Sequence, residues 1–217
     1  MSEYLDRTIA AYDQDPDKYE ASTAGMTPPV EFRRFVETIG GAGKTVLDAG
    51  CAFGRDTAEF KASGLIPVGI DLSDELLRKA VTSHPDIRFQ KMDVRKLSFD
   101  DHSFDGIWCH AVLLHLKDDG IITALREFHR VLKPGGILFI SFKKGEGARE
   151  VVEDFSSNSA RFFNYKTTEA VMEMLQRTGF TDIDAYYINE RDLFGPDKRD
   201  LDWVHCFSKN ASQQSPA

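Results

Sequence analysis

The stretch that decides the fold is Lys44-Thr-Val-Leu-Asp-Ala-Gly-Cys-Ala-Phe-Gly-Arg-Asp56. Residues 45–47 are β-formers that carry no signal for the start or end of a helix. Gly50 and Gly54 let the backbone approach a ligand closely, and a helix can begin at Arg55. The N–H groups at the start of that helix would face the ligand, and they suit a carboxylate or a phosphate. The stretch therefore predicts a nucleotide-binding turn between a buried strand and a helix.

Two carboxylates narrow the choice of ligand. Asp48 precedes the first glycine, where a dinucleotide-binding fingerprint has no acid. A negative charge at this point repels a pyrophosphate and attracts an ammonium or a sulfonium. Asp71 ends a second apolar run and lies 21 residues beyond Gly50, close to the spacing of about 20 residues at which an acid accepts ribose hydroxyls. A ribose joined to a cationic tail that bears a carboxylate describes S-adenosylmethionine.

Several motifs resemble those of the class I S-adenosylmethionine-dependent methyltransferases, in the order and spacing of that family. They are the first motif at Val46–Gly54, the second-strand motif at Val68–Ser73, the acidic turn on the adenine side at Gln90–Val94, and the fourth strand with the turn into the fifth at Phe104–Trp108 and Leu132–Leu138. Together they cover residues 44–142. The resemblance implies a Rossmann-like methyltransferase fold of the small-molecule type, with S-adenosylmethionine as the cofactor.

The pattern along the chain predicts a doubly wound α/β fold with a mostly parallel sheet. Strand-like runs alternate with helix-like runs through residues 44–142. Two β-rich runs follow at 183–189 and 203–209. The resemblance implies that these runs close a seven-stranded sheet and that the last strand is antiparallel.

The length of the chain, 217 residues and 24.4 kDa, suits one well-packed domain, which we expect to span residues 1–209. We expect residues 1–42 to form N-terminal helices that act as a lid, and 43–142 to form the cofactor-binding core. Residues 143–209 would then supply the substrate side and the closing strands. The tail 210–217 has little to bury, so we predict that it is disordered.

The residues expected to bind the cofactor gather around these motifs. A tight strand–helix turn in another α/β protein would explain the glycines, but it would not explain both Asp48 and Asp71. The resemblance places Asp93 on the adenine amino group and the backbone N–H of Val94 on the ring, with an Asx turn at Asp93 as the simpler alternative. The full expected set is Asp48, Gly50, Cys51, Gly54, Asp71, Leu72, Asp93, Val94 and His110.

Two histidines, His110 and His115, follow the fourth predicted strand, where an open α/β sheet places its ligands. A histidine is the right residue type to take a proton from a hydroxyl at neutral pH, so both are catalytic candidates. The stretch 111–116 also resembles a pattern that the family carries for unrelated substrates, so a pocket or packing role for His115 is an equal alternative. A carboxylate or thiolate acceptor would need no base at all.

A second group of side chains is left over after the cofactor motifs are assigned. Lys143, Arg161 and Tyr165 lie between the fifth strand and the last helix, and they combine cations with aromatic rings, which suits a small anionic molecule. Tyr12 and Tyr19 lie on the predicted N-terminal helices and can close over a substrate. We therefore expect these residues to bind the methyl acceptor. The phenylalanines beside Arg161 can equally be an anchor that pins the loop.

The composition excludes several classes of partner. A net charge of −8 argues against nucleic-acid binding, and no apolar run is long enough to span a bilayer. The three cysteines have neither disulfide nor metal-ligand spacing, so we expect no metal site. Residues 1–7 lack the pattern of a secretory signal, and a reducing cytoplasm fits best.

These observations predict methyl transfer from S-adenosylmethionine to a small molecule, with O-methylation ahead of N-methylation. Amine-directed DNA methylation is disfavoured because residues 108–111 read Trp-Cys-His-Ala, where that activity requires an Asn/Asp-Pro-Pro-Tyr type motif. Two alternatives stay open. One is aminopropyl transfer on the same fold, and the other is a module that binds the cofactor without turnover.

Overall fold

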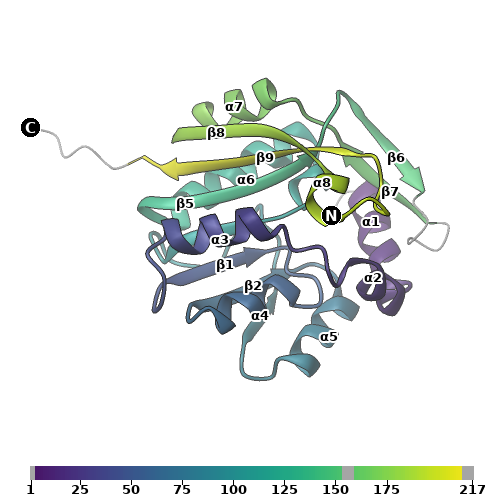
Figure 1. The fold of residues 1–217 in the computed structure, drawn as a ribbon, viewed down its shortest axis with the longest axis horizontal. Coiled ribbons are helices and arrows are strands. Elements are labelled where there is room, and N and C mark those ends of the chain that lie inside the picture. The colour runs from purple at the N-terminus through teal and green to yellow at the C-terminus, as the bar shows by residue number, and fades with distance from the viewer. Residues whose placement is uncertain (1–2, 153–158, 212–217) are drawn as a thin grey trace, which may run out of the picture.

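The central sheet has seven strands in the order β3-β2-β1-β4-β5-β9-β8 (Figure 1). It is seen in a computed structural model that describes residues 3–152 and 159–211. The strands are β1 (Thr45–Ala49), β2 (Ile66–Asp71), β3 (Arg88–Lys91), β4 (Phe104–Cys109), β5 (Leu132–Lys143), β8 (Phe180–Asn189) and β9 (Asp202–Asn210). β9 is antiparallel to both neighbours, while β1 to β5 pair in parallel. The predicted doubly wound, mostly parallel seven-stranded fold is confirmed.

Helices cover both faces of this sheet. They are α1 (Glu3–Asp13), α2 (Pro16–Thr23), α3 (Pro29–Thr38), α4 (Arg55–Ala62), α5 (Asp74–Ser83), α6 (Asp118–Val131), α7 (Thr168–Arg177) and α8 (Glu190–Phe194), with a 3-10 turn at Leu113–His115. No helix in the described ranges combines the length and the apolar character needed to cross a bilayer.

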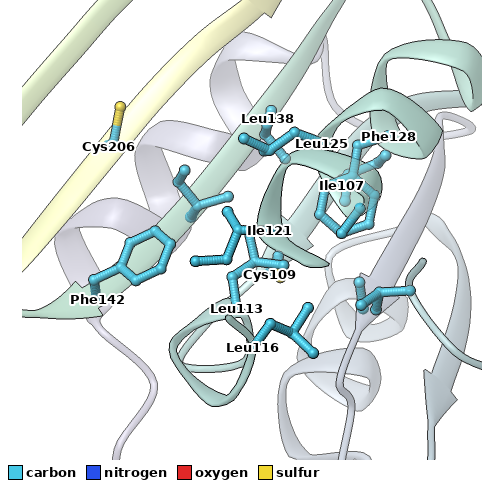
Figure 2. Close-up of a cluster of buried hydrophobic side chains, with 14 of the residues drawn as sticks. Ile107, Cys109, Leu113, Leu116, Ile121, Leu125, Phe128, Leu138, Phe142 and Cys206 are labelled. Carbon is cyan, nitrogen blue, oxygen red and sulfur yellow. The ribbon is translucent and has the colours of Figure 1, made fainter. Parts of the chain in front are cut away.

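Two apolar clusters hold the layers together, one on each face of the sheet. On the first face, Phe35 of α3 and Phe60 of α4 pack around Trp108 of β4. On the second face, α6 presents the buried residues Ile121, Leu125 and Phe128, whose helical spacing was visible in the sequence. Figure 2 shows this second cluster meeting Ile107, Cys109 and Leu138 of the sheet. Packing on both faces explains why β1, β4 and β5 are almost continuously apolar.

Three features differ from the sequence-based expectation. Asn210, expected to begin the disordered tail, is the buried last residue of β9, and its amide donates to the carbonyl of Leu132 at 2.8 Å. The rest of the expected tail, 212–217, lies outside the described residues. The segment before α7 contains a hairpin of β6 (Ala148–Val152) and β7 (Ala160–Asn164) that was not predicted, and neither was α8. The expected domain boundaries otherwise stay predictions.

Candidate cofactor and acceptor site

The candidate site lies at the carboxyl ends of β1, β2 and β4, where the turns after parallel strands meet at one edge of the sheet. Two adjoining cavities of about 100 Å³ and 260 Å³ open there. The residues that line both cavities are Tyr12, Tyr19, Gly50, Ala52, His110, Ala111 and His115. Tyr12 belongs to α1 and Tyr19 belongs to α2, so the N-terminal helices cover the junction of the two cavities.

The structure places the residues expected to bind the cofactor as follows: Asp71, Leu72, Asp93 and Val94 line the smaller cavity, Asp48 and Cys51 line the larger one, and Gly50 and His110 line both. Gly54 lies outside both. Its φ of 86° is in the left-handed region, and an added Cβ would come 2.9 Å from the ring of Phe89. Gly54 therefore makes the turn into α4, and its expected contact with the cofactor stays a prediction.

Asp71 is held rigidly at the tip of β2. Its two carboxylate oxygens accept backbone N–H groups from Ala52 and Ser73, each at 2.9 Å. Burial raises the pKa of Asp71, and these N–H groups oppose the rise. Each carboxylate oxygen still has a second lone pair for a hydroxyl group. The same contacts tie the glycine turn after β1 to the end of β2.

Asp93 forms the Asx turn that the sequence offered as one alternative, and it also lines the smaller cavity. Its carboxylate accepts the backbone N–H of Arg95 at 2.9 Å, which is an Asx turn, and it also pairs with the guanidinium of Arg95 at 2.6 Å. Burial acts to raise the pKa of Asp93, but the bonds from Arg95 outweigh it and lower the pKa. Asp93 also lines the smaller cavity beside Val94 and the apolar side chain of Leu116.

Two buried carboxylates, Asp48 and Asp56, lie at the floor of the larger cavity and have different partners. Asp48 accepts the hydroxyl of Thr57 at 2.5 Å, and burial together with the charge of Asp56 raises the pKa of Asp48. Asp56 accepts from Arg55 at 2.6 Å and from the indole N–H of Trp108 at 2.9 Å. Burial alone would raise the pKa of Asp56, but Arg55 outweighs it and lowers the pKa. Asp56 is therefore the more readily ionised member of the pair.

A chain of hydrogen bonds crosses the junction of the cavities. Nδ1 of His115 lies 2.7 Å from the carbonyl oxygen of Phe162, so Nδ1 carries the proton and Nε2 is an acceptor. The hydroxyl of Tyr12 lies 2.9 Å from this Nε2 and donates to it. Arg161 in turn donates to the hydroxyl oxygen of Tyr12 at 2.8 Å. The chain thus places a neutral imidazole and a fixed cation on either side of one phenol.

Both histidines are neutral at physiological pH. Burial, followed by the positive charge of Arg161, lowers the pKa of His115 to about 3. Burial also lowers the pKa of His110 to about 3, although Asp56 opposes the shift. Nδ1 of His110 lies 3.9 Å from a carboxylate oxygen of Asp56, too far for a hydrogen bond. Of the two catalytic candidates, only His115 is thus joined to a second polar group of the junction.

Most of the residues expected to bind the acceptor line the larger cavity, and one does not. Tyr12, Tyr19, Lys143 and Arg161 line the larger cavity. Tyr165 does not: its ring lies under the guanidinium of Arg149 at 4.0 Å and packs into the core, so its expected role at the acceptor stays a prediction that the cavity lining does not support.

One wall of the larger cavity was missed by the sequence analysis. It is formed by α8, the loop that follows it and the start of β9, with the lining residues Glu190, Leu193, Phe194, Asp197, Lys198, Arg199, Trp203 and His205. Glu190 is buried and accepts from Arg199 at 2.7 Å and from the indole of Trp203 at 3.2 Å. The only sequence signal was a histidine two residues after a tryptophan in a β-rich run, which puts both side chains on one face of the strand.

The comparisons with known proteins concern the family and the fold. Residues 46–136 match a family described as a methyltransferase domain. Phosphoethanolamine N-methyltransferase 1 of Arabidopsis thaliana is 28% identical over 95% of the chain, and malonyl-[acyl-carrier protein] O-methyltransferase of Erwinia billingiae is 34% identical over 50% of it. The chain spans only 44% and 43% of the length of these relatives.

Solved structures share the fold. The 1,6-didemethyltoxoflavin-N1-methyltransferase of Burkholderia thailandensis superposes with a TM-score of 0.73 and 23% identity, covering 96% of this chain and 88% of that one. Phosphoethanolamine N-methyltransferase 2 of Haemonchus contortus superposes with a TM-score of 0.74 and 18% identity, covering 98% and 61%.

Proposed function

We propose that the chain, which belongs to the class I S-adenosylmethionine-dependent methyltransferases, transfers a methyl group to a small acceptor that carries an anionic group. The observation that carries the proposal is the Tyr12–His115–Arg161 chain at the junction of two cavities. One cavity suits a nucleoside and the other suits a small charged molecule. The acceptor attacks where the two cavities meet.

The donor set of the smaller cavity fits the cofactor. Asp71 offers two carboxylate oxygens for ribose hydroxyls, while Asp93 and the N–H of Val94 offer an acceptor and a donor for the adenine edge. Asp48, which lines the larger cavity with Gly50, would balance the positive charge of the sulfonium. When bound, S-adenosylmethionine supplies an electrophilic methyl group whose leaving group is an uncharged thioether. The protein's task is then to orient the acceptor and to exclude water.

The larger cavity suits an acceptor with charges of both signs. Its walls include the cations Lys143, Arg161 and Arg199, and the carboxylates Asp56 and Glu190. Lys143 and Arg161 are buried, so an anion that reaches them is held in a medium of low polarity, where charge-assisted hydrogen bonds are strong. A phosphate or carboxylate of the acceptor binds at this cationic side.

Tyr12 and His115 handle the proton that a hydroxyl or an ammonium must lose. The acceptor gives its proton to the hydroxyl oxygen of Tyr12 as the phenol proton passes to Nε2 of His115, which is already in hydrogen-bond contact. Because the pKa of His115 is lowered to about 3, the imidazole relays this proton to water and does not keep it. Arg161 stabilises negative charge on the same phenol oxygen while the transfer takes place. The attacking atom would then have a free lone pair for the methyl group that bound S-adenosylmethionine would supply.

We place nitrogen first as the attacking atom and oxygen second. The relative that matches 95% of the chain is named for N-methylation, whereas the relative named for O-methylation matches 50% of it. A cavity with both cations and carboxylates also suits a zwitterion such as an amine with a phosphate group. Oxygen, favoured by the sequence, is retained because the Tyr12–His115 pair would activate a hydroxyl equally well.

The test uses three small phosphates that share one anion. They are phosphoethanolamine, 2-hydroxyethyl phosphate and ethyl phosphate, whose far ends are an ammonium, a hydroxyl and a methyl group. With labelled S-adenosylmethionine, we expect label in the product of phosphoethanolamine, less or none with 2-hydroxyethyl phosphate, and none with ethyl phosphate. Tight cofactor binding with no labelled product from these probes or from a metabolite extract would favour a non-catalytic module. Transfer from decarboxylated S-adenosylmethionine alone would favour aminopropyl transfer.

A further inference from the structure

A buried pair outside the cofactor motifs joins α3 to β9. Nδ1 of His205 lies 3.1 Å from a carboxylate oxygen of Glu31, and the hydroxyl of Tyr186 donates to the same oxygen at 3.0 Å. The exposed fractions of His205 and Glu31 are 0% and 1%. Glu31 therefore fixes the ring of His205 from the side that faces α3.

The contact with Glu31 decides which nitrogen of His205 carries the proton. A carboxylate is only an acceptor, and burial of Glu31 is outweighed by its bonds to His205, so its pKa is lowered and it is ionised. Nδ1 of His205 is thus a donor, and a ring that carries its single proton there keeps a lone pair on Nε2. Nε2 has no hydrogen-bond partner among the described residues, and it is fully buried.

His205 lies in the wall of the acceptor cavity. His205 lines the larger cavity together with Trp203, and its ring centroid lies 6.0 Å from that of His110, which lines both cavities. Nδ1 is bonded to Glu31, which does not line the cavity, so Nε2 is the nitrogen left for a group bound there. Most buried side-chain polar atoms in folded proteins have a hydrogen-bond partner, so an unpartnered nitrogen on a residue of the cavity wall is a candidate contact for a ligand.

We propose that Nε2 of His205, oriented by Glu31, accepts a hydrogen bond from an ammonium or hydroxyl group of the methyl acceptor. This inference rests on the proposed function, because it assigns a residue to the acceptor cavity. It deepens that function by requiring a hydrogen-bond donor on the acceptor in addition to the anion held by Arg161 and Lys143. The same feature selects against acceptors of similar size whose far end is apolar.

Two substitutions separate the two nitrogens of His205. His205→Asn keeps a donor amide near the Nδ1 position, so it preserves the contact with Glu31 and removes the Nε2 acceptor. His205→Gln places a carbonyl near the Nε2 position and removes the contact with Glu31. Tyr186→Phe is the matched control, because it removes a hydrogen bond to the same oxygen of Glu31 without changing the cavity wall.

The experiment measures the affinity of phosphoethanolamine and of ethyl phosphate for protein saturated with S-adenosylhomocysteine. In the native chain, we expect phosphoethanolamine to bind at least about tenfold more tightly. His205→Asn should reduce this ratio at least about threefold, while His205→Gln and Tyr186→Phe should keep most of it. All variants should bind S-adenosylhomocysteine with native affinity.

The outcomes that contradict this inference can be told apart from those that contradict the proposed function. A native ratio in His205→Asn, or a ratio lost in Tyr186→Phe, overturns the role of His205 and leaves the proposed function standing. Failure of every phosphate to bind the native protein overturns the anionic acceptor and this inference together. Should the variants fail to fold, the imidazole ¹⁵N signals of the native protein decide. The Nε2 signal of His205 must move with phosphoethanolamine and stay unchanged with ethyl phosphate; equal shifts overturn the inference.

Discussion

The hydroxyl of Tyr12 lies 2.9 Å from Nε2 of His115, although the two residues are far apart in the sequence. This bond ties the first helix to the turn after β4, next to the edge where β1 and β2 end. In the proposed function, it joins the lid to the proton acceptor. Methyl transfer would then require α1 to be seated on the sheet edge.

Replacing Tyr12 by phenylalanine removes the phenol oxygen and retains the ring. We expect the turnover rate to fall about 10²-fold or more, which is the usual contribution of a general acid or base, while the affinity for S-adenosylhomocysteine stays within a few-fold. Tyr4→Phe is the matched control, because Tyr4 lies on the same helix but lines neither cavity. Full turnover in Tyr12→Phe would exclude the phenol from the proton path.

Replacing Asp71 by alanine tests the ribose assignment. We expect the affinity for S-adenosylhomocysteine to fall at least about tenfold, because charge-assisted hydrogen bonds contribute roughly 1.5–3 kcal/mol. Calorimetry gives the affinity, and a thermal melt shows whether the turn that Asp71 holds has survived. Asp74→Ala, at an exposed ion pair with Lys91, is the control and should bind normally. Native affinity in Asp71→Ala would remove Asp71 from the cofactor site.

The N-terminal helices are expected to matter for the cofactor as well as for the acceptor. Leu5, Thr8 and Ile9 of α1 line the smaller cavity. Removing residues 1–22 should therefore abolish turnover. It should also lower the affinity for S-adenosylhomocysteine at least about tenfold, because burying one aliphatic side chain contributes about 1.5–3 kcal/mol. Calorimetry on the truncated and full chains provides the comparison. A truncated chain that turns over normally would mean that the lid and the acceptor cavity are misplaced.

The buried histidines make stability depend on pH. The pKa of His110 is about 3 in the folded chain and about 6.5 when unfolded, so the unfolded chain binds more protons between these values. Stability is fully present above pH 6.5 and is lost as the pH falls toward 3. Chemical denaturation at pH 7 and at pH 5 measures the free energy of unfolding. Between these pH values, the free energy of unfolding of the native chain should fall by about 2 kcal/mol more than that of His110→Gln. Equal losses would mean that His110 is solvated in the folded state.

The fold and the cofactor side could be predicted because their signals are local. Gly50 and Asp71 can be identified within a short stretch of sequence, because a strand, a glycine turn and an acid follow one another at a fixed spacing. Parallel pairing of the two strands then brings both residues to one edge of the sheet. The helical spacing of Ile121 and Leu125 was equally local. Gly54 was assigned to the ligand because the sequence cannot distinguish a glycine that makes a turn from one that faces a cofactor.

The acceptor side could be predicted only in part, because its contacts are distant in sequence. The hairpin of β6 and β7 determines which aromatic residues face the cavity. Because the hairpin was not predicted, the sequence could not show that Phe163 lines the cavity and Tyr165 does not. The helix α8 is five residues long, too short for a helical pattern to be recognised. Nothing near His205 in the sequence indicates that Glu31 lies beside it.

The most direct test of the central claim is methyl transfer itself. The full-length protein is incubated with labelled S-adenosylmethionine and phosphoethanolamine, or with a low-molecular-weight metabolite extract, and the products are separated by size and identified by mass. The account predicts a labelled small-molecule product that forms with the native chain and is nearly absent with Tyr12→Phe. A label found only in macromolecules, or a small product formed equally by Tyr12→Phe, would contradict it.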